Sequence, residues 1–260
     1  MRGIESTDQF RLSGAWNFRD VGGARTADGQ VVRSGLLFRS SELSRLDPRG
    51  VTELETLGVR HVFDLRGESE IRRSGTDRVP ASVTVHNVPY ENRKGKKAPH
   101  EVGAAMDPNA QREYMIRAYT SYPSLDGARA AIYTVAGALI QGDGGVLVHC
   151  AAGKDRAGWT IATVLRAVGV HEQDVLADYM TSNTAIEPLR AHLRSVWPAG
   201  LDGSPVELSD AVVGVTEAYY LRGLETVREL YGSFDGYLEA LALDRVYVDK
   251  LKSALLDSTD

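Results

Sequence analysis

The stretch that decides the fold covers residues 146–158 and reads Val-Leu-Val-His-Cys-Ala-Ala-Gly-Lys-Asp-Arg-Ala-Gly. Its start, Val146–Val148, is a short β-branched and apolar run of the kind that forms a buried strand. Trp159–Val168 carries a helical pattern, so the compact loop between these two segments joins a strand to a helix. Cys150 therefore lies where a strand ends, and we expect the helix to begin near Ala157.

The composition of this loop predicts a binding site for an anion. Amides of successive loop residues can point into one concavity, and the N-terminus of the following helix adds its positive end. Gly153 permits a backbone conformation that is closed to larger residues, and Arg156 offers a planar fork for two phosphate oxygens. We expect phosphate to be bound by Ala151, Ala152, Gly153, Lys154, Asp155 and Arg156.

Cys150 is the candidate nucleophile. The donors that bind a phosphate also favour the thiolate form of its side chain, and a thiolate below a bound phosphoryl group is placed for in-line attack. The alternative is an ordinary small buried residue, which an isolated cysteine at a strand end would usually be. Here His, Cys, Gly, Lys, Arg and a second Gly occur together between a strand and a helix, which favours the catalytic interpretation.

The segment 149–156, His-Cys-Ala-Ala-Gly-Lys-Asp-Arg, resembles the signature loop of the cysteine-dependent protein tyrosine phosphatases. Its Gly-Lys-Asp-Arg ending is similar to the bacterial PtpB-type branch of that family, which acts on phosphotyrosine, often on phosphoserine and phosphothreonine, and on phosphoinositides. Residues 17–23 (Asn-Phe-Arg-Asp-Val-Gly-Gly) and 231–234 (Tyr-Gly-Ser-Phe) also resemble this branch. The likeness spans most of the chain and is weakest over about 91–125.

The order of the elements and the resemblance together imply an α/β fold in a single phosphatase domain, residues 1–260. We expect a central, mostly parallel sheet flanked by helices, with an inserted helical lid at about 91–125 and a helical C-terminal part at about 171–257. Besides 146–148, strands are predicted at Val31–Phe38, Val59–Leu65 and Val83–Val88, and Phe10–Phe18 is predicted to be a strand or an extended entry to the fold. Helices are predicted at 48–57, 112–122, 126–140, 159–168, 174–181, 185–196, 217–231, 233–243 and 244–256.

Apolar spacing predicts the buried faces of two of these helices. In the helix at 217–231, the residues that suit packing against the sheet are Leu221, Leu224, Val227 and Leu230. The tyrosines of the segment at 112–122 are more typical of core packing than of a platform for substrate.

The resemblance implies a reaction in two steps that uses neither a metal nor a cofactor. The Cys150 thiolate attacks phosphorus while Arg156 and the loop amides hold the equatorial oxygens, and a general acid protonates the leaving oxygen. Water then hydrolyses the phosphocysteine, with the same group acting as a base. No metal is needed, because the loop donors already neutralise the charge of the phosphate.

The general acid has two candidates. Asp155 is the first, as in the PtpB-type branch, and Asp64 at the end of a predicted strand is the second. Asp155 could instead order the loop or pair with Arg19, and Asp64 could cap the segment that follows it. Many tyrosine phosphatases supply the acid from a Trp-Pro-Asp loop, but Trp197-Pro198 is followed by alanine and comes after the nucleophile, so we interpret it as structural.

Residues around the loop are candidates for support. We expect His149 to be a buried hydrogen-bonding support for the Cys150 side of the loop rather than a base. Asn17, Arg19 and Asp20 precede two glycines. They fit either turn chemistry with a surface ion pair or, by the resemblance, support beside the active site.

Two loop residues bear on rate and specificity. Ala157 stands where the family usually has Thr or Ser, whose hydroxyl stabilises the thiolate and helps the second step. We therefore predict slower breakdown of the phosphocysteine, or a less depressed pKa of Cys150, and Thr at this position should raise turnover. Lys154 resembles a lysine of relatives that cleave inositol phosphates, so it indicates a wider specificity. The basic cluster at 93–97 is either a solvated loop tip or a rim that attracts anionic head groups.

Composition excludes several classes of protein. A net charge of −5 over 260 residues argues against general nucleic-acid binding. The single cysteine excludes an internal disulfide and a multi-cysteine metal site, and it suits a reducing compartment. No apolar run approaches the ~20 residues of a membrane span, and Met1–Leu12 has no signal-peptide core. We expect a cytoplasmic protein, although the resemblance leaves open export without an ordinary signal.

We therefore expect an enzyme, a protein-tyrosine-phosphatase of dual specificity whose partners are phosphorylated proteins or phosphoinositides. A phosphatase that prefers phosphoinositides is the alternative within this class. A phosphate-binding module with little turnover is a second hypothesis, which Ala157 makes plausible. A sulfurtransferase is a third, and the Lys-Asp-Arg spacing and the preceding histidine argue against it. The sequence leaves the oligomeric state and the physiological substrate open.

Overall fold

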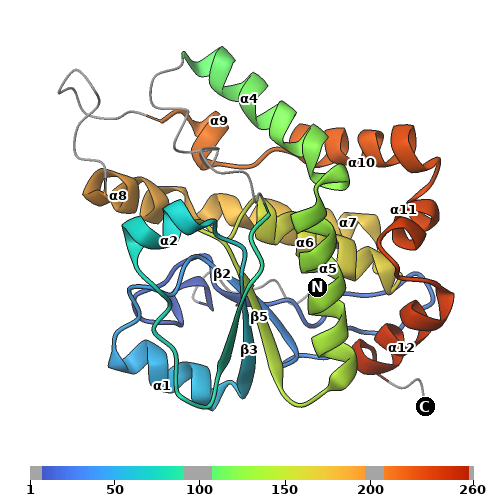
Figure 1. Ribbon diagram of the computed structural model, residues 1–260, viewed down its shortest axis with the longest axis horizontal. Coiled ribbons are helices and arrows are strands. Elements are labelled where there is room, and N and C mark those ends of the chain that lie inside the picture. The colour runs from blue at the N-terminus through green and yellow to red at the C-terminus, as the bar shows by residue number, and fades with distance from the viewer. Residues whose placement is uncertain (1–7, 91–106, 197–207, 258–260) are drawn as a thin grey trace.

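A computed structural model describes residues 8–90, 107–196 and 208–257. Within these residues five strands form one sheet in the order β1-β2-β5-β3-β4 (Figure 1). The strands are β1 (Arg19–Asp20), β2 (Leu37–Ser40), β3 (Val59–Asp64), β4 (Thr84–Asn87) and β5 (Gly145–His149). β1 runs antiparallel to β2 and the other pairs are parallel, which confirms the predicted mostly parallel sheet.

Helices flank this sheet, as predicted for the α/β class. They are α1 (Pro48–Thr56), α2 (Glu68–Ser74), α4 (Pro108–Ser121), α5 (Asp126–Gln141), α6 (Arg156–Ala167), α7 (Glu172–Thr181), α8 (Ile186–Val196), α9 (Asp210–Val213), α10 (Glu217–Tyr231), α11 (Phe234–Ala240) and α12 (Arg245–Leu255). Short 3-10 helices are η1 (Asp8–Phe10), η3 (Tyr122–Ser124) and η4 (Ser182–Ala185). α5 and α6 contact β5, whereas α4 lies against α10 at the top of the molecule in Figure 1.

β5 lies in the middle of the sheet and is buried on both faces. Val146 and Val148 pack into the larger apolar cluster of the molecule, and Leu147 packs into a smaller cluster. Successive side chains of a strand point to opposite faces, so both faces of the sheet are covered here. A parallel strand in this position must be apolar throughout, which explains the unbroken Val-Leu-Val run. Its last residue, His149, is level with Ser40 and Asp64, the last residues of the two neighbouring strands.

Two of the predicted N-terminal strands are wrong in extent. Phe10–Phe18 forms no strand: η1 precedes a turn at Gly14, whose φ is +95° and which approaches the carbonyl of Arg45 too closely for any side chain. The predicted Val31–Phe38 strand shrinks to β2, because Gly35 interrupts it with a φ of +82°. Residues 31 and 32 form only isolated bridges.

Two helices are absent from the sequence-based prediction. α9 is a single turn. α2 follows β3 directly, and the Glu70 side chain accepts a hydrogen bond of 2.9 Å from the amide of Gly67 at its start. This reciprocal cap is the signal that the sequence did carry, in the form of a glutamate three residues after the cap position. The remaining predicted helices are confirmed, with ends that differ by a few residues.

The predicted buried face of α10 is partly wrong. Leu221 and Leu230 are 39% and 55% exposed, whereas Val227 is 2% exposed. The buried side of the helix is instead built from Tyr219, Tyr220, Gly223, Thr226 and Val227. Gly223 lies against the indole ring of Trp159 on α6. α10 therefore presents aromatic and small residues to α6 and α4, and the leucine spacing marks its outer edge.

Some sequence-based predictions fall outside the described residues. These are the first part of the expected lid, with the basic cluster at 93–97, and the Trp197-Pro198 pair. The second part of the lid is described: Tyr119 of α4 and Tyr122 of η3 are buried in the core, as predicted. Among the helices that the structure describes, none has the length and apolar character needed to cross a membrane.

The burial of α10 gives a direct test of its packing. Val227→Ala should lower the free energy of unfolding by about 2 kcal/mol, because a fully buried apolar side chain is truncated. Leu230→Ala, the matched control on the outer edge, should change it by less than about 0.5 kcal/mol. Urea unfolding of both variants measures this, and a larger loss for Leu230→Ala would contradict the orientation of α10.

Candidate active site

The loop between β5 and α6 forms the floor of the site. It begins at Cys150, which is 2% exposed, and ends at Arg156, the first residue of α6. Gly153 has a φ of +68°, and a Cβ atom there would lie 2.2 Å from the carbonyl oxygen of Ser40. No other residue fits this conformation and this space, so the backbone role predicted for Gly153 is confirmed.

Four consecutive carbonyl groups of the loop are bonded from outside. The acceptors and donors are Ala151 O from the Glu42 amide (3.1 Å), Ala152 O from Asn17 Nδ2 (3.0 Å), Gly153 O from Arg39 Nη2 (2.7 Å) and Lys154 O from Arg39 Nη2 (3.2 Å). The C=O and N–H of a trans peptide point in opposite directions. The N–H groups of residues 152–155 therefore point to the inner side, an arrangement of the kind that can bind an anion.

The first turn of α6 adds to this concavity. Asp155 occupies the N-cap position, and its side chain makes no capping hydrogen bond. The first amides of an α-helix have no partner within the helix, and they carry the positive end of its dipole. An oxyanion at the N-terminus of α6 would therefore interact with these amides as well.

Arg156 is held by Glu70 of α2. Its Nη1 and Nη2 atoms donate to the two carboxylate oxygens of Glu70, each at 2.7 Å, and Nη1 also donates to the carbonyl of Leu65 at 3.3 Å. Among the residues that the structure describes, these bonds use three of the five guanidinium donors. The other two, on Nε and Nη2, share one edge of the group and form a fork for an oxyanion.

The electrostatic environment keeps Arg156 charged. Burial alone would lower the pKa of its guanidinium, but the carboxylate of Glu70 and the neighbouring Cys150 outweigh that effect and raise the pKa well above its ordinary value. A positive clamp and a potential nucleophile thus stand at the two ends of the loop.

Asp178 of α7 holds the outer side of the loop in place. Its carboxylate accepts a hydrogen bond from Arg39 Nη1 and one from Arg19 Nε, both at 2.6 Å. Burial would raise the pKa of Asp178, but the two guanidinium groups outweigh it and hold the pKa below its ordinary value. Burial and the charge of Arg39 in turn lower the pKa of Arg19 to about 10. The bond to Asp178 orients Arg39 so that its Nη2 atom donates to the carbonyl groups of Gly153 and Lys154.

The Asn17–Asp20 segment divides between the two roles considered for it. Asn17 donates to the loop at Ala152 and accepts from Arg19 at 2.6 Å, so both residues lie beside the loop. Asp20 instead accepts hydrogen bonds from the amides of Gly22 and Gly35, at 2.9 and 2.7 Å. Asp20 is thus placed for turn chemistry, away from the loop contacts of its neighbours.

Asp155 is bound by residues of the loop and of α4. Lys154 Nζ donates to both carboxylate oxygens, at 2.9 and 2.7 Å, and also to the carbonyl of Gly214 at 3.1 Å. The hydroxyl of Tyr119 donates to Oδ1 at 2.9 Å. The pairing with Arg19 that we considered for Asp155 is wrong, because Arg19 binds Asp178 instead.

His149 and Asp64 belong to a buried ionic cluster behind Cys150. His149 is bound through Nε2 to Asp77 at 2.7 Å and through Nδ1 to the carbonyl of Cys150 at 3.2 Å. Burial would lower the pKa of His149, but Asp77 and Asp64 outweigh it and raise the pKa. Both oxygens of Asp64 accept hydrogen bonds from the Arg66 side chain, at 2.9 and 2.8 Å, and one also accepts from the Arg66 amide.

This cluster has the composition of a metal site but holds its own cation. Oxygens of Asp64 and Asp77 and a ring nitrogen of His149 lie within 4.8 Å of one another. Arg66 donates to both carboxylates, so its guanidinium supplies the positive charge that a metal ion would bring. The arrangement therefore serves to fix His149 and the end of β5.

Several residues around the loop were not predicted from the sequence: Arg39, Glu70, Asp77, Tyr119, Asp178 and Tyr179. Arg39 carried a signal, because it follows a predicted strand at the same edge of the sheet as Asp64. The others come from helices or from a connecting segment, and their approach to the loop depends on packing. No pattern in the sequence identifies them.

Comparisons with known proteins agree with this geometry. The model of the tyrosine phosphatase family matches residues 10–257. The triple specificity protein phosphatase PtpB of Mycobacterium tuberculosis is 36% identical over 275 aligned positions, which cover 94% of this chain and 98% of that protein. A putative tyrosine-protein phosphatase of Cupriavidus necator is 30% identical, with coverage of 88% and 82%. The solved structure of TpbA from P. aeruginosa is 19% identical over 67% of this chain and 86% of its own, with a TM-score of 0.36. The chain belongs to the tyrosine phosphatase family.

Proposed function

We propose that this chain hydrolyses phosphotyrosine through a phosphocysteine formed on Cys150. The observation that carries the proposal is the outward bonding of four loop carbonyls, which turns the amides of residues 152–155 inward above the end of β5. The donors on Nε and Nη2 of Arg156 would bind the same oxyanion. The named activity of the family and of its relatives supports the same reaction.

The first step is attack of the Cys150 thiolate on phosphorus. A sulfur–phosphorus bond forms, and the bond from phosphorus to the tyrosine oxygen breaks with its electron pair on that oxygen. The amides and Arg156 stabilise the charge on the three equatorial oxygens. A proton from Asp155 neutralises the leaving phenolate. Asp64 is the second candidate for this proton; Arg66 donates to both of its oxygens, as Lys154 does to both oxygens of Asp155.

The second step is hydrolysis of the phosphocysteine. Asp155, now a carboxylate, removes a proton from water as its oxygen attacks phosphorus, and the Cys150 thiolate leaves. Lys154 and Tyr119 both donate to this carboxylate and hold it in place. Ala157 is fully buried and adds no hydroxyl to this step, so slow breakdown of the intermediate stays our prediction.

The substrate range is the second part of the proposal. A relative named as a triple specificity phosphatase supports activity on phosphoserine and phosphothreonine as well. Lys154 is 4% exposed and its ammonium is bound to Asp155 and Gly214. Any effect of Lys154 on phosphoinositide hydrolysis would therefore act through Asp155 and not through direct contact with a second phosphate. We propose that phosphoproteins are the main substrates and that phosphoinositides are the alternative. We also propose that the enzyme acts in the cytoplasm.

Replacing the nucleophile separates an enzyme from a phosphate-binding module. The wild type should hydrolyse 4-nitrophenyl phosphate, and Cys150→Ser should show no turnover above background, because the serine hydroxyl is not ionised at neutral pH. Rapid acid quench and mass spectrometry of the wild type should find one phosphate on the peptide that contains Cys150.

The control for this test is binding. Cys150→Ser retains the loop amides and Arg156, so calorimetry should still detect inorganic phosphate. Phosphate binding by the wild type without any hydrolysis would favour the low-turnover module and contradict the proposed reaction.

The ion pair of Arg156 gives a second prediction. Glu70→Gln leaves one acceptor oxygen where two hold the guanidinium, so kcat/KM for aryl phosphates should fall about tenfold, the equivalent of about 1.4 kcal/mol. The matched control is Glu68→Gln on the same helix, whose side chain is 76% exposed and pairs with Arg72 at the surface. Its kcat/KM should equal that of the wild type, and equal losses in both variants would contradict the clamp.

A further inference from the structure

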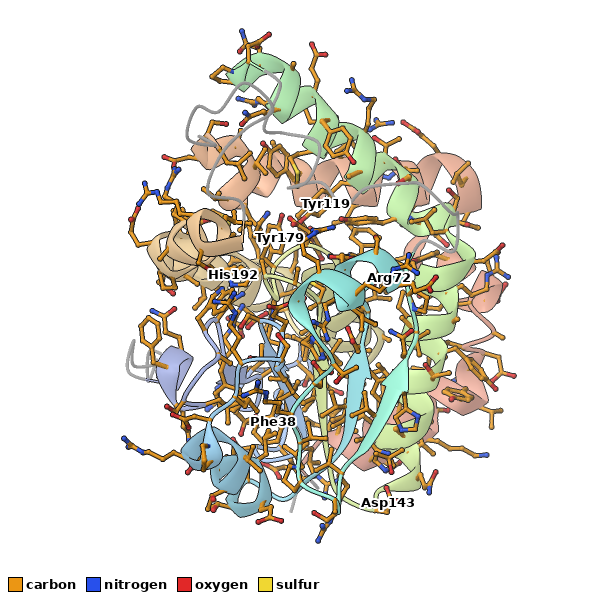
Figure 2. The ribbon with its side chains drawn as sticks, turned by 60° about the vertical axis from the view of Figure 1, so that its left-hand side comes forward. Phe38, Arg72, Tyr119, Asp143, Tyr179 and His192 are labelled. Carbon is orange, nitrogen blue, oxygen red and sulfur yellow. The ribbon has the colours of Figure 1, made fainter. Side chains whose placement is uncertain are left out.

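A chain of hydroxyl groups runs from α7 to Asp155. Tyr179 of α7 donates to the hydroxyl of Tyr119 at 2.7 Å, and Tyr119 of α4 donates to Oδ1 of Asp155 at 2.9 Å. The two tyrosines lie close together in Figure 2, where both are labelled. A hydroxyl has one proton to donate. Because Tyr119 accepts from Tyr179, its own proton is committed to Asp155.

Both tyrosines are rigidly placed. Tyr119 is fully buried, and its ring packs against the rings of Tyr122, Tyr179 and Tyr219, with centroid distances of 4.9, 6.2 and 5.7 Å. Burial and the charge of Asp155 raise the pKa of Tyr119 well above its ordinary value, and burial does the same for Tyr179. Both hydroxyls therefore stay neutral, and they act as fixed donors and not as sources of protons.

The two oxygens of Asp155 differ in their partners. Among the residues that the structure describes, Oδ1 accepts from Tyr119 and from Lys154, whereas Oδ2 accepts from Lys154 alone. A hydrogen bond from a neutral hydroxyl can be accepted by a carboxylate and also by the carbonyl oxygen of a protonated carboxyl group. The bond from Tyr119 to Oδ1 thus persists in both protonation states. Oδ2 is left to carry the proton that moves.

We propose that Tyr119, oriented by Tyr179, is a positioning residue that fixes the rotation of the Asp155 carboxyl group and makes Oδ2 the catalytic oxygen. This inference rests on the proposed role of Asp155 as general acid. Lys154 cannot do the same, because its ammonium donates to both oxygens and does not distinguish one from the other.

The test compares two substrates that differ in their need for an acid. Phenyl phosphate has a basic leaving group that must be protonated, whereas 2,4-dinitrophenyl phosphate has a leaving group stable as an anion. kcat/KM reports formation of the phosphocysteine, the step in which the acid acts. Tyr119→Phe keeps the ring and removes the donor, so kcat/KM should fall about tenfold on phenyl phosphate and less than about twofold on the dinitrophenyl ester. Tyr179→Phe should show a smaller change of the same kind.

Three further variants make the result decisive. Asp155→Asn should lose about a hundredfold on phenyl phosphate, and adding Tyr119→Phe to it should cause no further loss. Tyr237→Phe is the matched control, since Tyr237 is also fully buried and its hydroxyl binds Trp159, away from Asp155. Its ratio between the two substrates should equal that of the wild type.

The outcomes separate this inference from the proposed function. If Asp155→Asn lowers kcat/KM mainly on phenyl phosphate but Tyr119→Phe does not, the positioning role of Tyr119 is wrong while the assignment of Asp155 as the acid stands. The same conclusion follows if Tyr119→Phe lowers kcat/KM equally on both substrates. If Asp155→Asn itself is unselective, the assignment of the acid is wrong, and the role of Tyr119 falls with it.

Discussion

The outward pull on the carbonyl groups of the loop after β5 is the constraint on which the rest of the structure depends. Arg39 holds two of these carbonyls, and Asn17 and the amide of Glu42 hold two more. Because each trans peptide is planar, its N–H group points opposite to its C=O group, so the direction of the N–H groups is fixed as well. A short loop without these bonds would sample many conformations, and its amides would not converge. The direction of the loop amides is therefore set by groups on the opposite, outer side of the loop.

That constraint requires charged side chains to be buried, and their removal from water costs free energy. Arg19, Arg39 and Asp178 are all buried, and the two guanidinium groups share the charge of the one carboxylate. Arg156 likewise pairs with Glu70, and His149 with Asp77. These pairs fix geometry at the cost of stability, which the large apolar core of the molecule offsets. α7 contributes on two sides, through Asp178 to the loop carbonyls and through Tyr179 to Asp155.

The sequence predicts the parts of this site that are contiguous in the chain. The Val-Leu-Val run, Gly153 and the helix after Arg156 follow from local pattern, and the parallel order of β2, β5 and β3 agrees with the α/β expectation. Local pattern failed where a turn interrupts it, as at Gly14 and Gly35.

The partners of the loop could not be predicted in the same way. Asp178 and Glu70 look like ordinary helical acids until packing brings each of them to a guanidinium. Tyr119 was expected to be core, and it is, but its hydroxyl also reaches Asp155. On α10 the apolar spacing was only partly right, because Leu221 and Leu230 are exposed and the helix also buries glycine and tyrosine against Trp159. Burial of a polar side chain next to a loop is a property of the fold and not of a motif.

The most direct test of the account is an amide NMR titration with inorganic phosphate. The account predicts that, in Cys150→Ser protein, the proton signals of the amides of residues 152–155 move downfield together as phosphate binds, since each donates to the anion. If phosphate binds and leaves those four signals in place while amides elsewhere shift, the inward nest is not the anion site and the account is contradicted.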